Sequence, residues 1–243
     1  MRNNIRYLQV YILLFTTLLT NTISWSQQDS LSNIESGYTY HSSIDITEVS
    51  GNTLSVNYKT LPANQAGKLQ NKLWIWRASE VPWQYPPMKE QLLQEDATQS
   101  GSYVLENLKI AISTEYIVCY SVGPEVTQIC TCATLSVNKD TINKQWVEIS
   151  LLNISRNSIS FSYKTLKGYL PKTYQNWFGL WEGQASPYNL DIPIAKDNVS
   201  SDSNISSGGL NNLSLDIGQI YTLIYFTGSQ EANAAAMIRF KVY

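Results

Sequence analysis

The sequence of 243 residues contains one histidine, His41, and three cysteines. Any mechanism that needs a histidine base or a histidine-rich metal site would depend on His41 alone. In the internal repeat described below, the position equivalent to His41 is Trp146, which neither transfers a proton nor binds a metal. Three cysteines also leave a four-ligand zinc site one ligand short. We therefore expect no metal site and no cofactor, and we interpret His41 as a surface residue.

Charged residues and catalytic motifs are also scarce. Charged residues make up 15% of the chain, against roughly 25% in an average globular protein. Lys and Arg number 17 and Asp and Glu 19, which gives a net charge of −2 and argues against nucleic-acid partners. The sequence has no nucleophile elbow, H-E-x-x-H motif, P-loop or dinucleotide-binding glycine fingerprint. We expect a protein that is not an enzyme, and a hydrolase with carboxylates from Glu95, Asp96 or Asp191 is the third of three alternatives.

The N-terminus has the pattern of an export signal. Arg2 and Arg6 precede a mostly apolar stretch at residues 7–20, and Ser24 and Ser26 provide the small residues of a cleavage site. At 1.5 Å per residue the apolar stretch covers about 21 Å, less than the ~30 Å hydrocarbon core of a bilayer. The sequence predicts a signal peptide over residues 1–26, no membrane span after its cleavage, and a secreted or periplasmic protein.

The chain contains a tandem repeat with an offset of 105 residues. Residues 46–138 align with residues 151–243 without a gap, and Tyr58-Lys-Thr-Leu61 falls on Tyr163-Lys-Thr-Leu166. This register predicts two copies of one module. The expected organisation after the signal is a polar N-terminal segment (27–43), repeat 1 (44–138), a polar linker (139–146) and repeat 2 (147–243).

The signals within each repeat are those of β-strands. Residues 53–58 and 158–163 alternate polar and apolar side chains, which is typical of a strand with one buried face. Residues 114–122 and 127–137 flank Gly123-Pro124 and predict a hairpin. The best helical candidate, at residues 88–95, is short. Several short strands in about 95 residues predict an all-β chain of two β-sandwiches.

One segment of each repeat resembles a known family. Two leucines precede a tyrosine and an alternating strand in both copies: Leu105, Leu108, Tyr116 and Tyr120, and Leu210, Leu213, Tyr221 and Tyr225. This pattern is similar to the tyrosine corner of fibronectin type III and related immunoglobulin-like modules. The resemblance implies a buried tyrosine ring whose hydroxyl bonds to backbone upstream. It also implies a protein that binds, adheres or acts as a spacer.

The cysteines allow two interpretations. In a hairpin that pairs residue 122 with residue 127, Cys119 lies opposite Cys130, within reach of a disulfide after a small adjustment. An oxidising compartment favours that bridge. Alternatively, the third cysteine, Cys132, and the other two are all buried as apolar residues, because repeat 2 has Ile224, Ala235 and Met237 at their positions.

The aromatic residues provide the functional hypothesis. In the strands at 73–76 and 178–181, the residues at one set of alternate positions are apolar in both copies. The other set of alternate positions keeps a tryptophan in both copies, beside lysine or glycine. That second set predicts rings exposed to solvent, which suit the C–H faces of sugars; the alternative is that they pack over the edge of the sandwich. The candidate ligand-binding residues are Trp74, Trp76, Trp83, Tyr85, Trp177, Trp181 and Tyr188.

The leading functional hypothesis is an exported, non-catalytic binding protein that recognises a glycan or cell-surface ligand through one aromatic patch in each repeat. The first alternative is a structural or protein–protein interaction module that binds through an exposed strand edge. An exposed tryptophan pair would favour a glycan, and a flat, unpaired strand edge would favour a protein partner.

Overall fold

The computed structural model describes residues 37–78, 82, 84–111, 113–136, 138 and 140–243. These residues belong to one compact unit that spans residues 31–243. The expected signal peptide lies outside the described residues, as do residues 27–36 of the expected polar segment. In the part of the chain that is described, no helix is long and apolar enough to span a bilayer.

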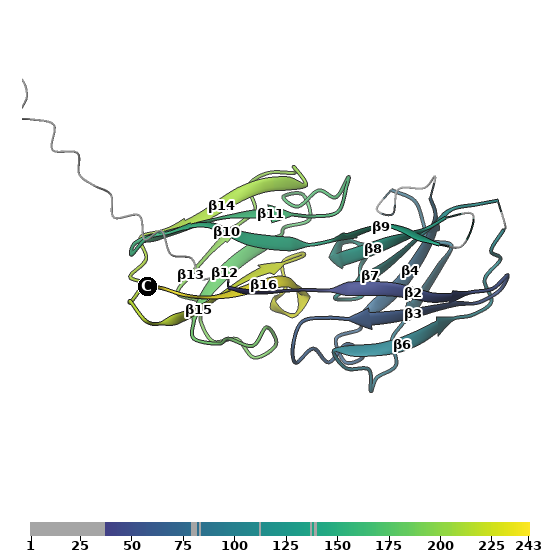
Figure 1. Ribbon diagram of the computed structural model, residues 1–243, viewed down its shortest axis with the longest axis horizontal. Helices are drawn as coiled ribbons and strands as arrows, with labels where there is room; N and C mark the ends of the chain where they lie inside the picture. The colour runs from purple at the N-terminus through teal and green to yellow at the C-terminus, as the bar shows by residue number, and fades with distance from the viewer. Residues whose placement is uncertain (1–36, 79–81, 83, 112, 137, 139) are drawn as a thin grey trace, which may run out of the picture. The chain divides into compact units, whose positions relative to one another are not determined.

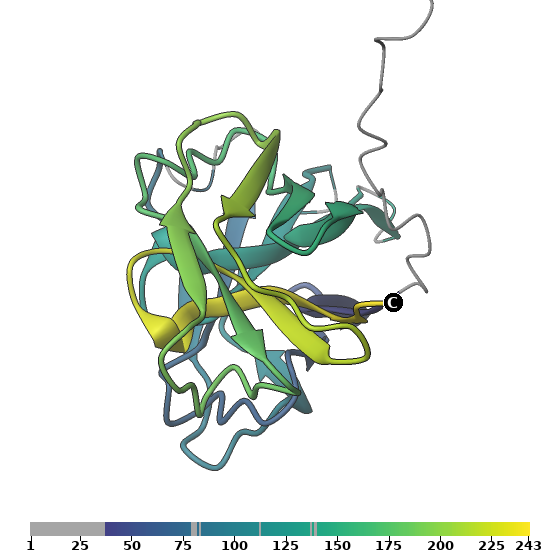
Figure 2. The same ribbon diagram turned by 90° about the vertical axis from the view of Figure 1, so that its left-hand side faces the viewer.

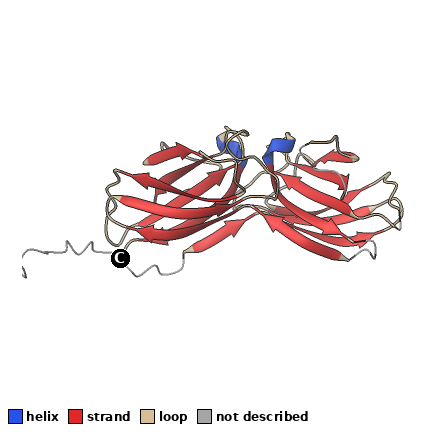
Figure 3. Cartoon of the chain, turned by 90° about the horizontal axis from the view of Figure 1, so that it is seen from above, coloured by secondary structure: helices blue, strands red, loops and turns tan. Residues whose placement is uncertain are grey.

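Almost all regular structure in the described residues is β (Figure 3). Two single-turn 3₁₀ helices, η1 and η2, precede the last strand of each repeat: Val126–Gln128 and Glu231–Asn233. The strands of the first half are β1 Tyr38–His41, β2 Ser43–Val49, β3 Leu54–Lys59, β4 Lys72–Arg77, β5 Lys89–Leu92, β6 Ser100–Leu105, β7 Tyr116–Ser121 and β8 Ile129–Leu135. Those of the second half are β9 Thr141–Trp146, β10 Glu148–Ile154, β11 Ser158–Lys164, β12 Trp177–Glu182, β13 Ala195–Asn198, β14 Ile205–Asn211, β15 Ile220–Phe226 and β16 Ala234–Lys241. The best helical candidate, at residues 88–95, does not form a helix, because residues 89–92 of that segment are strand β5.

The strands form four antiparallel sheets that make two sandwiches (Figure 1). Sandwich 1 packs the sheet β2-β3-β6 against the sheet β5-β4-β7-β8-β9, and sandwich 2 packs β10-β11-β14 against β1-β16-β15-β12-β13. Without β9 in sandwich 1 and β1 in sandwich 2, each sandwich packs a three-stranded sheet against a four-stranded sheet. This is the architecture of tandem fibronectin type III or immunoglobulin-like modules, so the predicted fold class is confirmed.

The 105-residue repeat is also present in the backbone. Leu54 pairs with Leu105, and Ile159 pairs with Leu210. Left-handed residues recur at the same offset: Gln70 and Gln175 have φ of 55° and 58°, and Asn107 and Asn212 have φ of 57° and 58°. The ungapped alignment fails at one strand. Residue 72 pairs with residue 92 in sandwich 1, whereas residue 177 pairs with residue 198 in sandwich 2, so β13 is displaced by one residue relative to β5.

Both tyrosine corners are present. The Tyr116 hydroxyl accepts a hydrogen bond from the backbone N–H of Ala111 at 2.8 Å, and the Tyr221 hydroxyl accepts one from Asp216 at 2.9 Å. The two rings are 1% and 2% exposed. Each corner therefore ties the approach to strand β7 or β15 to the loop that precedes it.

The two sandwiches exchange strands, which the sequence did not predict. Strand β1 pairs with β16 of sandwich 2, while β2, one residue further on, belongs to sandwich 1. Reciprocally, β9 pairs with β8 of sandwich 1, and β10 belongs to sandwich 2. The expected linker at residues 139–146 is thus largely a strand, as are residues 38–41 of the expected polar segment. Figure 2 shows the purple N-terminal strand running beside the yellow C-terminal strand.

The exchange starts in the same register in both sandwiches, although a bulge in β8–β9 shifts the pairing by one residue beyond Ala133. His41 pairs with Ala236, and Trp146 pairs with Thr131, which are the equivalent positions 105 residues apart. The rings of His41 and Trp146 stack on each other with centroids 5.2 Å apart. The arrangement is therefore reciprocal: the strand that precedes each sandwich in the chain pairs with the larger sheet of the other sandwich.

Candidate functional site

The tryptophans of the two larger sheets lie on the faces that point away from the sandwich cores, as the alternation predicts. Trp74 and Trp76 extend from β4, and Trp177 and Trp181 extend from β12. The prediction that these faces are exposed to solvent is wrong, because these four side chains are 4%, 0%, 6% and 3% exposed.

A second apolar layer covers these faces. Leu166 and Tyr169, in the loop after β11 of sandwich 2, pack with Trp74 and Trp76 of sandwich 1. Leu61, the equivalent of Leu166, packs with the tryptophans of sandwich 2. The outer face of each strand was assigned correctly. That face is covered by a loop of the other sandwich and, in sandwich 2, also by Tyr188 and Leu190 of its own loop, so neither face provides a platform for a sugar ring.

Three of the four indole N–H groups have structural partners, whereas the Nε1 of Trp177 is buried and has no hydrogen-bond partner among the described residues. Trp76 donates to the backbone carbonyl of Tyr85 at 3.0 Å, and Trp181 donates to that of Asp191 at 2.8 Å. Trp74 donates to the Ser121 hydroxyl at 2.8 Å. Trp76 and Trp181 thus hold the loop after their own strand in place by a hydrogen bond. This structural role explains why both recur, without a ligand.

The remaining candidates do not form a common surface. Tyr85 is 54% exposed, whereas Tyr188 is partly buried against the tryptophans of sandwich 2. Burial raises the pKa of the Tyr188 hydroxyl, which keeps it protonated. Trp177 stacks on Phe226 with ring centroids 3.9 Å apart, and the Lys196 ammonium lies 5.7 Å from its ring. Trp83 lies outside the described residues.

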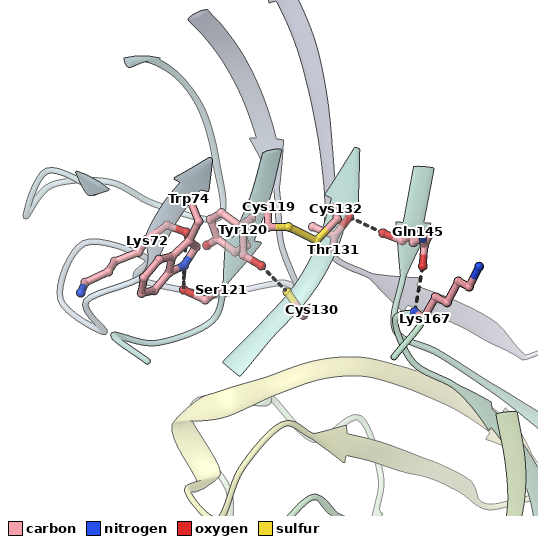
Figure 4. Close-up of a disulfide and its surroundings, with 10 residues drawn as sticks. All are labelled: Lys72, Trp74, Cys119, Tyr120, Ser121, Cys130, Thr131, Cys132, Gln145 and Lys167. Atoms are coloured by element: carbon pink, nitrogen blue, oxygen red, sulfur yellow. Dashed lines mark hydrogen bonds between the residues drawn. A yellow bond between two sulfur atoms is a disulfide. The ribbon is translucent and has the colours of Figure 1, made fainter. Parts of the chain in front are cut away.

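The disulfide joins Cys119 to Cys132, so the predicted pairing of Cys119 with Cys130 is wrong (Figure 4). The hairpin contains a β-bulge: Tyr120 pairs with Thr131, and Ser121 pairs with residue 129. Cys130 is the extra residue of the bulge and has no cross-strand partner, whereas Cys119 lies directly opposite Cys132 with a Cα–Cα distance of 4.0 Å.

Cys130 is free and fully buried in the sandwich core. Its thiol lies 3.6 Å from the carbonyl oxygen of Tyr120. Burial raises the pKa of the thiol to about 12. Because the thiolate is the reactive form, this cysteine is inert at neutral pH.

Nothing in the described residues brings together the groups expected of the hydrolase alternative. Glu95 and Asp96 are exposed in sandwich 1, and Asp191 is exposed in sandwich 2. No group of three or more histidine, cysteine or acidic residues is placed to hold a metal ion in the described ranges.

The surface offers two features that sequence reasoning missed. The first is strand β14, an edge strand without charged residues, which can be found from its composition once residues 205–211 are assigned to a strand. The second is a cleft of about 500 Å³ along β1 and β16, lined by three tyrosines, two cations and a glutamine: Tyr38, Tyr40, Tyr243, Arg239, Lys241 and Gln184. The cleft depends on the pairing of residue 38 with residue 239, which no local pattern reveals.

The sequence matches no protein-family model and no curated protein. Among solved structures, the chain is similar to the first three fibronectin domains of chicken CNTN1, with 12% identity and a TM-score of 0.27 over 84% of this chain and 67% of that one. A DUF3823 family protein from Parabacteroides merdae is 13% identical, with a TM-score of 0.32 over 84% of this chain and 98% of that one. The BSP domain of a biofilm-associated protein is 13% identical, with a TM-score of 0.25 over 86% of this chain and 29% of that one.

Proposed function

We propose that this chain is an exported, non-catalytic protein-interaction module that binds an extended segment of a partner protein along strand β14. The observation that carries the proposal is the contrast between β14 and the other sheet edges except β6, its equivalent in sandwich 1. Strands β2, β5, β9, β10 and β13 each contain at least one charged residue, and β1 has only four residues. Charged side chains and short length are the usual protection of an edge against pairing with another chain.

Strand β14 lacks these protections. It has seven residues, Ile-Ser-Ser-Gly-Gly-Leu-Asn, with no charge and no proline. It pairs with β11 on one side only, so alternate backbone N–H and C=O groups on its other side lack a ladder partner. At Ile205 these groups bond to the Ser203 hydroxyl, so the edge that is open to a peptide begins after that residue. Ile205, at its start, is 64% exposed. An extended peptide that adds to this edge gains main-chain hydrogen bonds and an apolar contact with Ile205.

Core packing explains one of the two glycines of β14, Gly208. A Cβ on Gly208 would lie 2.8 Å from the Phe161 ring in the core. On the outward face, Gly209 and Ser207 present little side-chain bulk beside the edge. Equivalent strand β6 is also uncharged but has six residues, so β14 is the longer of the two unprotected edges.

The test is a selection from a phage-displayed library of 12-residue peptides against residues 27–243. Selected peptides are expected to slow amide hydrogen exchange at residues 205–211. Ser207→Lys should weaken their binding at least tenfold. Ser162→Lys is the matched control, because Ser162 pairs with Ser207 on the same sheet but lies on the interior strand.

Binding that protects a different segment, or that both lysine variants weaken equally, would contradict the assignment to β14. The leading hypothesis of the sequence analysis, glycan recognition through an aromatic patch in each repeat, loses its basis because the tryptophans that suggested it are buried.

A further inference from the structure

The cleft along β1 and β16 has chemistry that the proposed protein-interaction function does not use. Tyr38 and Tyr40 alternate along β1, and Arg239 and Lys241 alternate along β16, so the four side chains share one face of the sheet. Tyr38 pairs directly with Arg239. The Tyr38 side chain is 77% exposed, which leaves its ring available to a ligand.

The two cations lie among aromatic rings. The Arg239 guanidinium carbon lies 5.4 Å from the centroid of the Tyr40 ring, and the Lys241 ammonium lies 5.2 Å from that of Tyr243. Within the described part of the chain, neither cation has a carboxylate within 4.0 Å, because the two ion pairs found there involve other residues.

Arg239 is incompletely satisfied. Its Nη2 donates a hydrogen bond of 3.3 Å to the carbonyl of Ala185, but its Nε is buried and has no hydrogen-bond partner among the described residues. A buried donor without an acceptor is destabilising, and more so when it is charged. The enclosed Nε is out of reach of a ligand in the cleft, but the guanidinium has more N–H donors than Ala185 accepts, and an anion in the cleft would bond to the remaining Nη donors.

We propose that this cleft binds an acidic sugar, with the anion at Arg239 and Lys241 and the sugar ring on the face of Tyr38. The guanidinium fork matches a carboxylate or a sulfate, and a sugar presents its C–H face to a tyrosine ring while its hydroxyls bond to the Gln184 amide. A volume of about 500 Å³ is within the range of small-ligand sites. An acidic peptide fits less well, since it would not use the exposed tyrosine face and β1 offers only four residues for pairing.

The test uses residues 27–243 in affinity electrophoresis through gels that contain one of two anionic polysaccharides (polygalacturonate or dextran sulfate), neutral dextran, or poly-glutamate as a model of an acidic peptide. Retardation is expected in one or both anionic gels and not in neutral dextran, and the two anionic arms separate carboxylate from sulfate recognition. Retardation should fall as salt rises, because the cations are near the surface.

Two variants locate the site, each with a matched control. Tyr38→Ala and Lys241→Gln should each weaken retardation at least tenfold. Tyr85→Ala removes another exposed tyrosine, and Lys196→Gln removes another lysine that lies over a ring; both lie outside the cleft and should change retardation less than twofold. Arg239 is left intact because it also packs within the fold.

Four results would each overturn the proposal. They are no retardation in either anionic gel, equal retardation in neutral dextran, equal losses in the control variants, and tighter binding of poly-glutamate than of either anionic polysaccharide. Ser207→Lys on β14 is expected to leave retardation unchanged, so this site and the proposed peptide edge can fail independently.

Discussion

Removal of residues 1–42 should destabilise sandwich 2, although all of these residues precede sandwich 1 in the chain. The deletion removes β1, which forms four cross-strand pairs with β16, from Tyr38–Arg239 to His41–Ala236. Each pair contributes roughly 0.2–1 kcal/mol, so the expected loss in the free energy of unfolding is about 1–4 kcal/mol. Tyr40, which packs against the aromatic cluster of sandwich 2, places the loss in the upper half of that range.

The matched control is removal of residues 1–36, which leaves β1 in place. Urea unfolding of the two truncated proteins measures the difference, and amide hydrogen exchange locates it. Residues 236–239 of β16 should exchange faster in the shorter protein, whereas the equivalent residues 131–134 of β8 should not, because they pair with β9. Equal stability of the two proteins, or a loss of protection confined to sandwich 1, would refute the exchanged-strand arrangement.

Three further predictions concern individual groups. Tyr116→Phe and Tyr221→Phe should each lower the free energy of unfolding by about 1–3 kcal/mol, since a backbone N–H loses its acceptor; urea melts test this, and unchanged stability would contradict the corner. Replacement of Cys119 and Cys132 by alanine should cost about 3 kcal/mol through the loop that the disulfide closes, and a melting temperature equal to that of the parent would argue against the bridge. Partial burial lowers the pKa of His41, so stability should fall as the pH drops below about 6.5, and His41→Gln should reduce that dependence; identical pH profiles would contradict it.

The sequence predicted the parts of the fold that depend on local alternation and on the repeat. Strands β3 and β11 follow period-two patterns, and the tyrosine corners occupy the predicted positions. The hairpin between β7 and β8 was also predicted, but its register was not. A single bulge residue, Cys130, shifts the pairing and selects Cys132 as the disulfide partner of Cys119. A bulge depends on how a strand packs against its neighbours, so counting residue pairs outward from the turn does not reveal it.

The error over the tryptophans has a different origin. Alternation correctly assigned Trp76 and Trp181 to the face away from the core, but it does not show what covers that face. The cover includes Leu166 and Leu61, each from a loop of the other sandwich, and in sandwich 2 also Tyr188 and Leu190 of the loop that follows β12. A linker of eight residues suggested separate modules, whereas six of those residues form β9 and join the neighbouring sheet. The first error follows from contacts between segments that are far apart in the sequence, whereas the second arises because the polar segment folds back on β8, the strand just before it.

The repeat separates residues that build the fold from residues that can carry function. The tyrosine corner, the loop leucines and the fastened tryptophans recur in both copies, and each has a structural explanation. The cleft residues Tyr38, Tyr40, Arg239 and Lys241 do not recur, because the positions 105 residues away hold Asn143, Gln145, Thr134 and Ser136. This cleft is therefore not repeated in the other sandwich, and the chain does not have two copies of it. A ligand that depends on these cations should bind once per chain, and a measured stoichiometry of two would show that the site lies in the repeated part of the fold instead.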